Sequence, residues 1–393
     1  MITLLFIVMI FILLLVIDFK LGRKHHHQNP RKLPFRRTTG DYHLFKNGSP
    51  LYERLFQDIA SATKQVDIFF YLIDNDYISE NFLQILKNKA SEGVPVRLLT
   101  DRLGGYRVNK QMRQSLKEAG VDFHFAEVPG FPYLFYRLNR RNHRKIAVID
   151  GEIAYAGGFN IGKNYIGETP KFGDWRDYHM RLTGPVVQEL HGVFLDDWYL
   201  ATGEKHEAIH VDKEGAHPLS ITATDGFGLE EEINEIIKDC QQELLIGSPY
   251  FIPSPTLQNS LLKALKRGVQ LYILVPLKAD HPFVKEGGLP YLKELSEHGA
   301  HVKFFDAGFY HAKVIMSDQK LADLGTANFD RRSLFLNKEV NTFIYDDTFV
   351  RNLRNMYMED FEDAISLDES FWKNRSLKTK FNQKLAILLR PFL

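Results

Sequence analysis

The chain has 393 residues, of which 44% are hydrophobic and 25% charged, and its formal net charge is +1. This length suits two domains of ordinary size, each with enough apolar residues to bury a core. A net charge near zero argues against general electrostatic binding of nucleic acid, so any basic binding surface must be local. The single cysteine, Cys240, excludes an intramolecular disulfide and any zinc site made of cysteines, and it fits a reducing compartment.

The chain begins with an apolar run at residues 1–17, MITLLFIVMIFILLLVI. At about 1.5 Å per residue, a helix of this length reaches about 25 Å, just enough to cross a bilayer. The run lacks the basic start and the small-residue cleavage site of a secretory signal, so we expect an uncleaved transmembrane anchor at 1–19. The basic linker expected at 20–40 predicts that all later residues lie in the cytoplasm. Three consecutive histidines at 25–27 are interpreted as part of a flexible polar linker.

The rest of the chain carries the same order of elements twice. The expected strands are 66–74, 94–101 and 121–127 in the first copy and 243–253, 269–276 and 300–305 in the second. Short apolar runs that alternate with amphipathic helices ending in glycine predict mostly parallel sheets flanked by helices. We therefore expect an α/β fold with two pseudo-twofold-related lobes, at 41–212 and 213–393.

Each copy then shows the spacing H-x-K-x-x-x-x-D, followed by a glycine and an asparagine at fixed distances. The two sets are His143, Lys145, Asp150, Gly157 and Asn160, and His311, Lys313, Asp318, Gly325 and Asn328. A single three-residue match arises by chance, but two five-residue matches in register do not. Because side chains alternate along a strand, the histidine and lysine of each copy share one face. Asp150 begins a predicted tight hairpin turn, and Gly157 with Gly158 is expected to let the backbone approach a bound group.

This set of side chains favours an anionic ligand. A protonated lysine has no lone pair and repels cations, so we expect neither a metal nor another cofactor. A phosphodiester fits best, because one imidazole can attack phosphorus while the imidazole of the other copy protonates the leaving oxygen. Lys145, Lys313, Asn160 and Asn328 would hold the non-bridging oxygens. On residue chemistry alone, either histidine can be the nucleophile.

Each histidine also needs a partner that fixes its tautomer. Asp177 and Glu339 follow the histidine of their own copy by 34 and 28 residues. We expect each acid to orient that histidine, as in a catalytic triad. The alternative is that both are ordinary acids at strand ends.

The twin motifs resemble those of the phospholipase D superfamily. The stretches FGDWRDYHMRLTGPVV, GTANFDRRS and SPYFIP, together with the N-terminal anchor, are similar to bacterial cardiolipin synthases of a shorter branch with one anchor. The resemblance covers nearly the whole chain. It implies that His143 is the nucleophile and His311 the general acid and base, that Asp150 and Asp318 are structural, and that no metal is needed.

Two further segments are candidates for membrane contact. The first copy is longer than the second before its motif, and the excess is the run VPGFPYLFYRLNRR at 128–141. Its aromatic and arginine residues suit a loop that dips into an anionic membrane surface, and the alternative is a loop that only covers the core. The basic segment 371–393 ends in apolar residues, which favours an interfacial helix.

These features predict a phosphatidyltransferase in the bacterial cell membrane, a single-pass protein with its lobes on the cytoplasmic side. It would join two phosphatidylglycerol molecules into cardiolipin and release glycerol, and its partners would be phosphatidylglycerol, anionic lipids and the membrane. With water as acceptor, the same chemistry gives a phospholipase or a nuclease. The anchor argues against nucleic acid as a partner. A scaffold with decayed catalytic residues is a third alternative, disfavoured because both motifs are intact.

Overall fold

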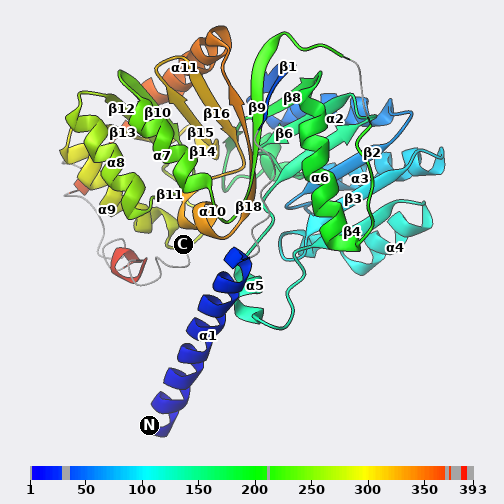
Figure 1. Cartoon of the computed structure of the whole chain (residues 1–393), viewed down its shortest axis with the longest axis horizontal. Coiled ribbons are helices and arrows are strands. Elements are labelled where there is room, and N and C mark those ends of the chain that lie inside the picture. Colours follow the sequence, from blue (N-terminus) through cyan, green and yellow to red (C-terminus); the bar gives the residue numbers. More distant parts are fainter. Residues whose placement is uncertain (1, 29–35, 210–212, 368–370, 373–381, 387–393) are drawn as a thin grey trace.

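A computed structural model describes residues 2–28, 36–209, 213–367, 371–372 and 382–386. Helix α1 (Ile2–Gln28) extends away from a body in which one sheet runs through both halves of the chain (Figure 1). Most of the segment 371–393 lies outside the described residues, so the interfacial helix expected there stays a prediction.

The first half follows the predicted alternation of strands and helices. Its elements are β1 (Arg36–Phe45), α2 (Gly48–Ala60), β2 (Val66–Phe70), α3 (Tyr77–Ser91), β3 (Val96–Asp101), α4 (Lys110–Glu118), β4 (Asp122–Ala126), α5 (Leu134–Asn139), β5 (Lys145–Ile149), β6 (Ile153–Gly157), β7 (Asp174–Arg176), β8 (His179–Thr183) and α6 (Val186–Thr202), with short 3-10 turns at Gly104–Arg107 and Lys163–Ile166.

The second half repeats this order. Its elements are β9 (His217–Asp225), α7 (Leu229–Asp239), β10 (Glu243–Gly247), β11 (Phe251–Ile252), α8 (Pro255–Lys266), β12 (Gln270–Pro276), α9 (Val284–Glu297), β13 (His301–Phe305), β14 (Gly308–Tyr310), β15 (Val314–Ser317), β16 (Leu321–Gly325), β17 (Phe329–Asp330), α10 (Arg331–Phe335), β18 (Lys338–Ile344), α11 (Asp347–Glu362) and β19 (Ile365–Ser366).

The strand order confirms the predicted repeat. From the central antiparallel pair β1–β9, the sheet runs outward as β8-β6-β5-β2-β3-β4 on one side and as β18-β16-β15-β10-β12-β13 on the other. Within this large sheet of the described residues, parallel pairing is confined to β2-β3-β4 and β10-β12-β13. The sheet is therefore mixed rather than mostly parallel. The motif strands turn back through tight hairpins, and a tight hairpin imposes antiparallel pairing.

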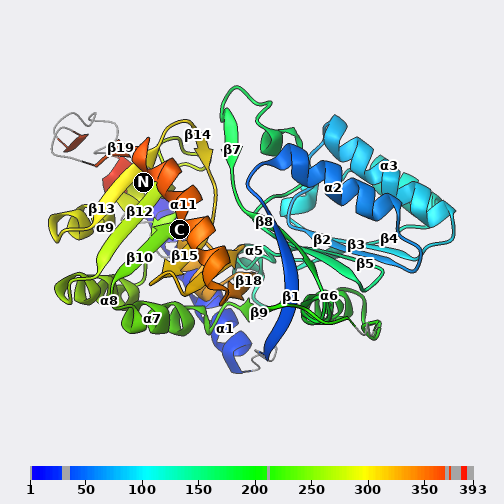
Figure 2. The same cartoon turned by 90° about the horizontal axis from the view of Figure 1, so that it is seen from above.

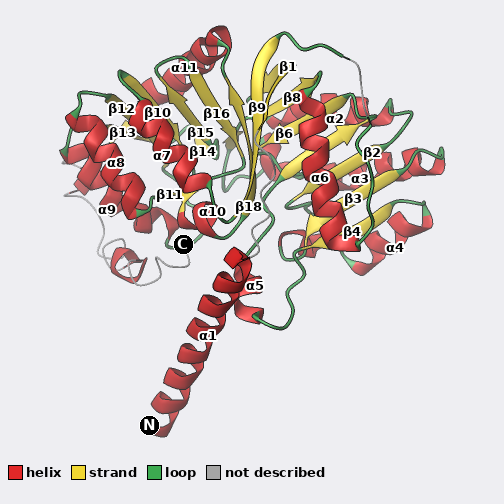
Figure 3. Ribbon diagram, viewed as in Figure 1, coloured by secondary structure: helices red, strands yellow, loops and turns green. Residues whose placement is uncertain are grey.

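Helices cover both faces of the sheet (Figures 2 and 3). In the first half, α2 and α3 lie on one face and α6 on the other. Two outer cores lie under α2 and α3 and under α7, α8 and α9. A third core contains buried residues of both α6 and α11, including Trp198 and Tyr357. Because this core joins the two halves, they form one packed body.

The structure corrects the expected organisation of residues 20–40. Helix α1 continues to Gln28, and β1 already begins at Arg36, so part of the predicted linker is helical and the first lobe starts before residue 41. Nor are the histidines part of a flexible linker. Nδ1 of His26 lies 2.6 Å from the Tyr136 hydroxyl, and its Nε2 lies 3.3 Å from Asp225. These contacts hold the end of α1 against the body of the protein. The boundary expected at 212 falls on residues outside the described part and stays a prediction.

Candidate active site

The two histidines of the motifs lie in one cavity of about 430 Å³ between the halves. His143 lies two residues before β5, and its backbone N–H donates to the Lys338 carbonyl in the other half. His311 directly follows β14, and its backbone N–H donates to Arg176 in the first half. Each histidine is thus fixed by the opposite half, which brings two residues far apart in sequence into one site.

Each histidine contacts the acid of the other half. Nδ1 of His143 lies 3.0 Å from Oε2 of Glu339, and Nδ1 of His311 lies 2.6 Å from Oδ2 of Asp177. The expectation that each acid pairs within its own copy is therefore wrong.

Two short parallel pairings explain the exchange of partners. Tyr310 pairs with Arg176 between β14 and β7, so the next residues, His311 and Asp177, lie side by side. Asn142 likewise bridges to Lys338, which places His143 beside Glu339. Sequence distance carries no signal for pairings across the interface.

The two buried acids differ in their surroundings. The carboxylate of Glu339 also accepts hydrogen bonds from Thr326 Oγ1 at 2.6 Å and Ser333 Oγ at 2.8 Å. Burial alone would raise the pKa of Glu339, but the charge and hydrogen bond of His143, the hydrogen bond from Thr326 and the charge of Lys145 hold it below its usual value. The pKa of Asp177 is raised by burial, against the opposing charge of Lys313.

Burial lowers the pKa of both histidines, so both imidazoles are neutral at pH 7 in the free protein. Nδ1 of His143 faces two acceptors, the Glu339 carboxylate and the Thr326 carbonyl at 3.1 Å. Its Nδ1 must therefore carry the proton, which leaves a lone pair on Nε2. Nδ1 of His311 instead lies between Asp177 and the ammonium group of Lys313, which is 2.7 Å away.

Both motif lysines lie directly behind the histidines. Burial lowers the pKa of Lys145 to about 7 and that of Lys313 to about 8. Nζ of Lys145 donates to the His143 carbonyl at 2.7 Å. The cavity lining includes both histidines but neither lysine, so the phosphate contacts expected of the lysines stay a prediction.

The two motif asparagines do line the cavity. Asn160 is held in place because its Oδ1 accepts from the Leu72 N–H and its Nδ2 donates to the Tyr165 hydroxyl, both at 3.1 Å. Oδ1 of Asn328 is buried and has no hydrogen-bond partner among the described residues. Since buried polar atoms are normally paired, this amide is suited to contact a ligand.

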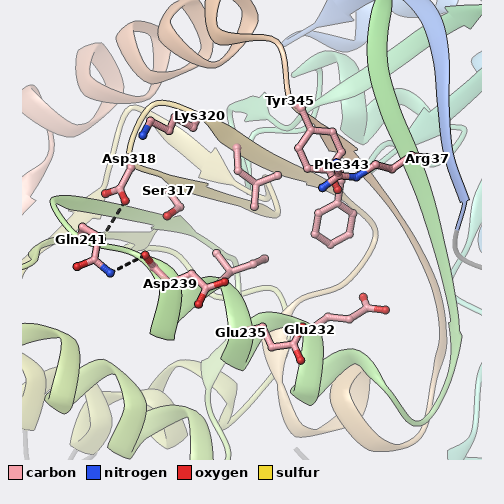
Figure 4. A pocket seen from close by; sticks show the side chains of 12 residues that line it. Arg37, Glu232, Glu235, Asp239, Gln241, Ser317, Asp318, Lys320, Phe343 and Tyr345 are labelled. Atoms are coloured by element: carbon pink, nitrogen blue, oxygen red, sulfur yellow. Dashed lines mark hydrogen bonds between the residues drawn. The ribbon is translucent and has the colours of Figure 1, made fainter.

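Asp150 and Asp318 lie outside this cavity. The carboxylate of Asp150 accepts backbone N–H groups of residues 63–65, and that of Asp318 accepts those of residues 241–243. Figure 4 shows Asp318 beside Gln241, in a different pocket of about 480 Å³. Burial raises the pKa of both acids, but these hydrogen bonds outweigh it and hold the pKa low. Both groups thus tie a hairpin to the start of a neighbouring strand, which is a structural role.

The glycine at 158 serves a contact different from the expected one. A Cβ atom placed on Gly158 would lie 2.0 Å from Oδ1 of Asp177. Any side chain there would therefore displace the carboxylate that contacts His311. The lack of a side chain at Gly158 makes room for the Asp177 carboxylate, whereas we expected it to make room for a bound group.

Sequence reasoning missed several residues of the cavity. Tyr71 packs edge-on against His143, and Trp175 packs against His311, with ring centroids 5.0 and 4.9 Å apart. The lining also includes Arg141, Arg332 and Asp280. Tyr71 directly follows β2 and Asp280 closely follows β12. The rule that sites form at the carboxyl ends of parallel strands would have found these two.

A buried ion network lies behind the site. The guanidinium group of Arg144 contacts Asp197 at 2.8 Å, the Thr224 carbonyl at 2.8 Å and the Glu339 carbonyl at 3.1 Å. Lys338 contacts the same Asp197 at 3.0 Å. The network therefore joins β5, which follows His143, to β18, which carries Glu339.

The comparisons with known proteins agree with this geometry. A family described as "Cardiolipin synthase, PLD-like domain" matches residues 55–171 and 233–361, one match in each half. The minor cardiolipin synthase ClsB of Bacillus subtilis is 38% identical, over 100% of this chain and 99% of its own. Cardiolipin synthase 2 of Staphylococcus epidermidis is 35% identical, over 91% of this chain and 76% of its own.

This chain belongs to the cardiolipin synthase family. It is therefore an enzyme, and the predicted family is confirmed.

Solved structures show the same fold. Phosphatidylserine synthase of Haemophilus influenzae has a TM-score of 0.67 at 18% identity, covering 95% of this chain and 100% of its own. Polyphosphate kinase of Porphyromonas gingivalis has a TM-score of 0.59 at 16% identity, covering 84% of this chain and 49% of its own. At these identities the likeness extends to the fold alone.

Helix α1 is a candidate membrane span, and its last turns contact the body of the protein. Within the described residues, one helix, Thr3–Gln28, is long and apolar enough to cross a membrane, and its most apolar window is 0% buried. Its Asp18 accepts the backbone N–H of Tyr136 in α5 at 2.9 Å. The run 128–141 is therefore partly packed against α1, whereas Phe131 is 83% exposed. Figure 1 shows α5 and α10 at the end of the body from which α1 leaves.

Proposed function

We propose that the protein is a cardiolipin synthase that transfers a phosphatidyl group between two phosphatidylglycerol molecules through a phosphohistidine on His143. The observation that carries this proposal is the cavity lined by both motif histidines, each of which is paired with an acid of the other half. In-line displacement at phosphorus needs a nucleophile and an acid on opposite sides, and the pseudo-twofold arrangement supplies both.

In the first step, Nε2 of His143 attacks phosphorus, and the bond from phosphorus to the glycerol oxygen breaks. His311 gives its proton to that oxygen, so glycerol leaves as a neutral alcohol. A bound phosphate anion favours the charged form of His311 and thus opposes the effect of burial on its pKa. Glu339 stabilises the positive charge that develops on His143.

In the second step, His311 removes the proton from a hydroxyl of the second phosphatidylglycerol. The new oxygen–phosphorus bond forms as the bond from Nε2 to phosphorus breaks, and His143 returns to its starting state. One phosphodiester replaces another, so the free-energy change of the reaction is close to zero. Excess glycerol should therefore drive the reaction backwards.

The neighbours of Nδ1 distinguish the nucleophile, His143, from the general acid and base, His311. Two acceptors surround Nδ1 of His143, so its Nε2 holds a lone pair and suits nucleophilic attack. His311 lies between an acid and a lysine, a setting suited to a group that gains and loses a proton in each cycle.

We further propose that α1 crosses the bacterial cell membrane with the lobes on the cytoplasmic side, as the basic residues after it favour. The exposed Phe131 and Arg137 would contact anionic lipid beside α1. The other two arginines of the run 128–141 are held in ion pairs within the protein. Phosphatidylglycerol would then reach the cavity from the bilayer, and nucleic acid is not a substrate of this site. We also propose that the reaction needs no metal ion, because the lysines beside the histidines would repel a cation.

The test uses the purified full-length enzyme in phosphatidylglycerol vesicles. Glycerol and cardiolipin should form in equal amounts, and His143→Ala and His311→Ala should each abolish both products. His298→Ala, at an exposed histidine after α9, is the matched control and should keep full activity. Phosphatidic acid as the main product would mean that water is the acceptor and that the transferase proposal is wrong.

A further inference from the structure

The cavity that contains the histidines also contains a carboxylate that the proposed chemistry does not use. Asp280 lines the cavity together with His311 and Tyr250. Its side chain is 16% exposed, so it is accessible to a ligand. A carboxylate repels a phosphate anion, which indicates that Asp280 serves another part of the substrate. The second acid of the lining, Asp330, already caps α10 through the Ser333 N–H.

Asp280 is held in place but keeps free acceptor capacity. The Tyr250 hydroxyl donates to its Oδ2 at 2.5 Å, and the His281 N–H donates to its Oδ1 at 2.8 Å. The His281 imidazole lies 3.7 Å from Oδ2 and is mostly exposed. An ionised carboxylate offers about four lone-pair positions, so each oxygen can accept a further hydrogen bond. The group is thus oriented for a ligand that donates hydrogen bonds.

Asp280 has no acidic counterpart at the equivalent place in the first half. Asp280 follows β12, and the equivalent strand of the first half is β3. The residues after β3, RLGGYRVN at 102–109, contain two arginines and no acid. The charge of Asp280 also acts on His311, where it opposes the lowering of the pKa by burial. The carboxylate therefore lies on the side of the general base, where an acceptor hydroxyl must arrive.

We propose that Asp280, oriented by Tyr250, accepts hydrogen bonds from the hydroxyl groups of the acceptor alcohol and thereby selects polyol headgroups over simple alcohols. This inference rests on the proposed transfer of a phosphatidyl group to an alcohol. In a glycerol headgroup, one hydroxyl attacks phosphorus while its neighbour binds Asp280. A simple alcohol has no second hydroxyl and gains nothing from the carboxylate.

The experiment compares two three-carbon acceptors with one donor. Full-length enzyme in phosphatidylglycerol vesicles receives labelled glycerol and 1-propanol together, and labelled phosphatidylglycerol and phosphatidylpropanol are quantified. In Asp280→Asn, the ratio of transfer to glycerol over transfer to propanol should fall about tenfold, because a hydrogen bond to a charged group is lost. Tyr250→Phe should lower the ratio in the same direction and by less. Asp306→Asn makes the same chemical change at an exposed site after β13 and should leave the ratio unchanged.

An unchanged ratio in Asp280→Asn would overturn the inference, and so would an equal fall in Asp306→Asn. A wild-type preference for ethanolamine over glycerol would also overturn it, since the site would then select an ammonium group. If Asp280→Asn does not fold, Tyr250→Phe tests the inference in its place. An unchanged ratio of transfer to glycerol over transfer to propanol in Tyr250→Phe would then overturn it. If the wild type transfers to both alcohols but makes no cardiolipin, the proposed function fails while the ratio still tests Asp280.

Discussion

Arg144 offers a direct test of how the two halves hold the site together. Its side chain is among the largest that are fully buried, and all three of its nitrogen groups are bonded to Asp197 or to backbone carbonyls. Arg144→Met keeps much of the volume but leaves the carbonyls of Thr224 and Glu339 without this donor. Within the described part of the chain, Asp197 would then keep only Lys338 as a charged partner. Removing one member of a buried ion pair costs about 3–5 kcal/mol, so the free energy of unfolding should fall by that amount.

The assay is urea unfolding of the full-length protein in detergent, followed by tryptophan fluorescence. Arg351→Met, at an exposed arginine of α11, is the matched control and should change stability by less than about 0.5 kcal/mol. Arg144→Met should also lower kcat about 10–100-fold with a smaller change in KM, because the Glu339 backbone loses a contact that positions it against His143.

A double-mutant cycle with Asp197→Asn isolates the ion pair. The two substitutions should cost less together than the sum of their separate effects, with a coupling of about 0.5–3 kcal/mol. Equal stability of Arg144→Met and Arg351→Met, or strict additivity in the cycle, would refute the reasoning.

The motif residues and the N-terminal anchor give four further predictions. His143→Ala and His311→Ala should each abolish turnover, because neither histidine completes a catalytic cycle alone. The double variant should be no less active than either single variant, and a further loss of kcat in the double variant would contradict this. Glu339→Gln removes the negative charge that raises the pKa of His143, so the acidic limb of the pH–rate profile should move to lower pH; a shift to higher pH would contradict the crossed pairing. Asp150→Ala should lower the free energy of unfolding by about 1–3 kcal/mol with KM unchanged, since backbone N–H groups lose their acceptor, and urea unfolding measures the change. A reporter fused after Leu393 should lie in the cytoplasm, and its cleavage by external protease in intact spheroplasts would rule out the proposed orientation.

Features that depend on neighbouring residues were predictable from the sequence. The alternation of apolar residues predicted the strand that begins at Lys145, although His143 lies just before this strand and not on it. Asp150 marked the hairpin that joins β5 to β6. The repeated spacing predicted two related halves, and the apolar run predicted the long N-terminal helix. The strand, hairpin and helix signals are local, because backbone geometry repeats every few residues and a short window of sequence contains it. The repeat is visible because the same local pattern occurs twice along the chain.

Contacts across the interface were decided by the tertiary structure. Glu339 meets His143, and Asp177 meets His311, because short strand pairings between the halves set their registers. Asp280 reaches the cavity because it closely follows β12, and this place after a parallel strand is the one sign of its role that the sequence holds. A spacing along the chain fixes which residues share a strand face, whereas the partner of a side chain depends on how the two halves join. That join follows from the central β1–β9 pair and the shared core, and both exist only in the folded protein.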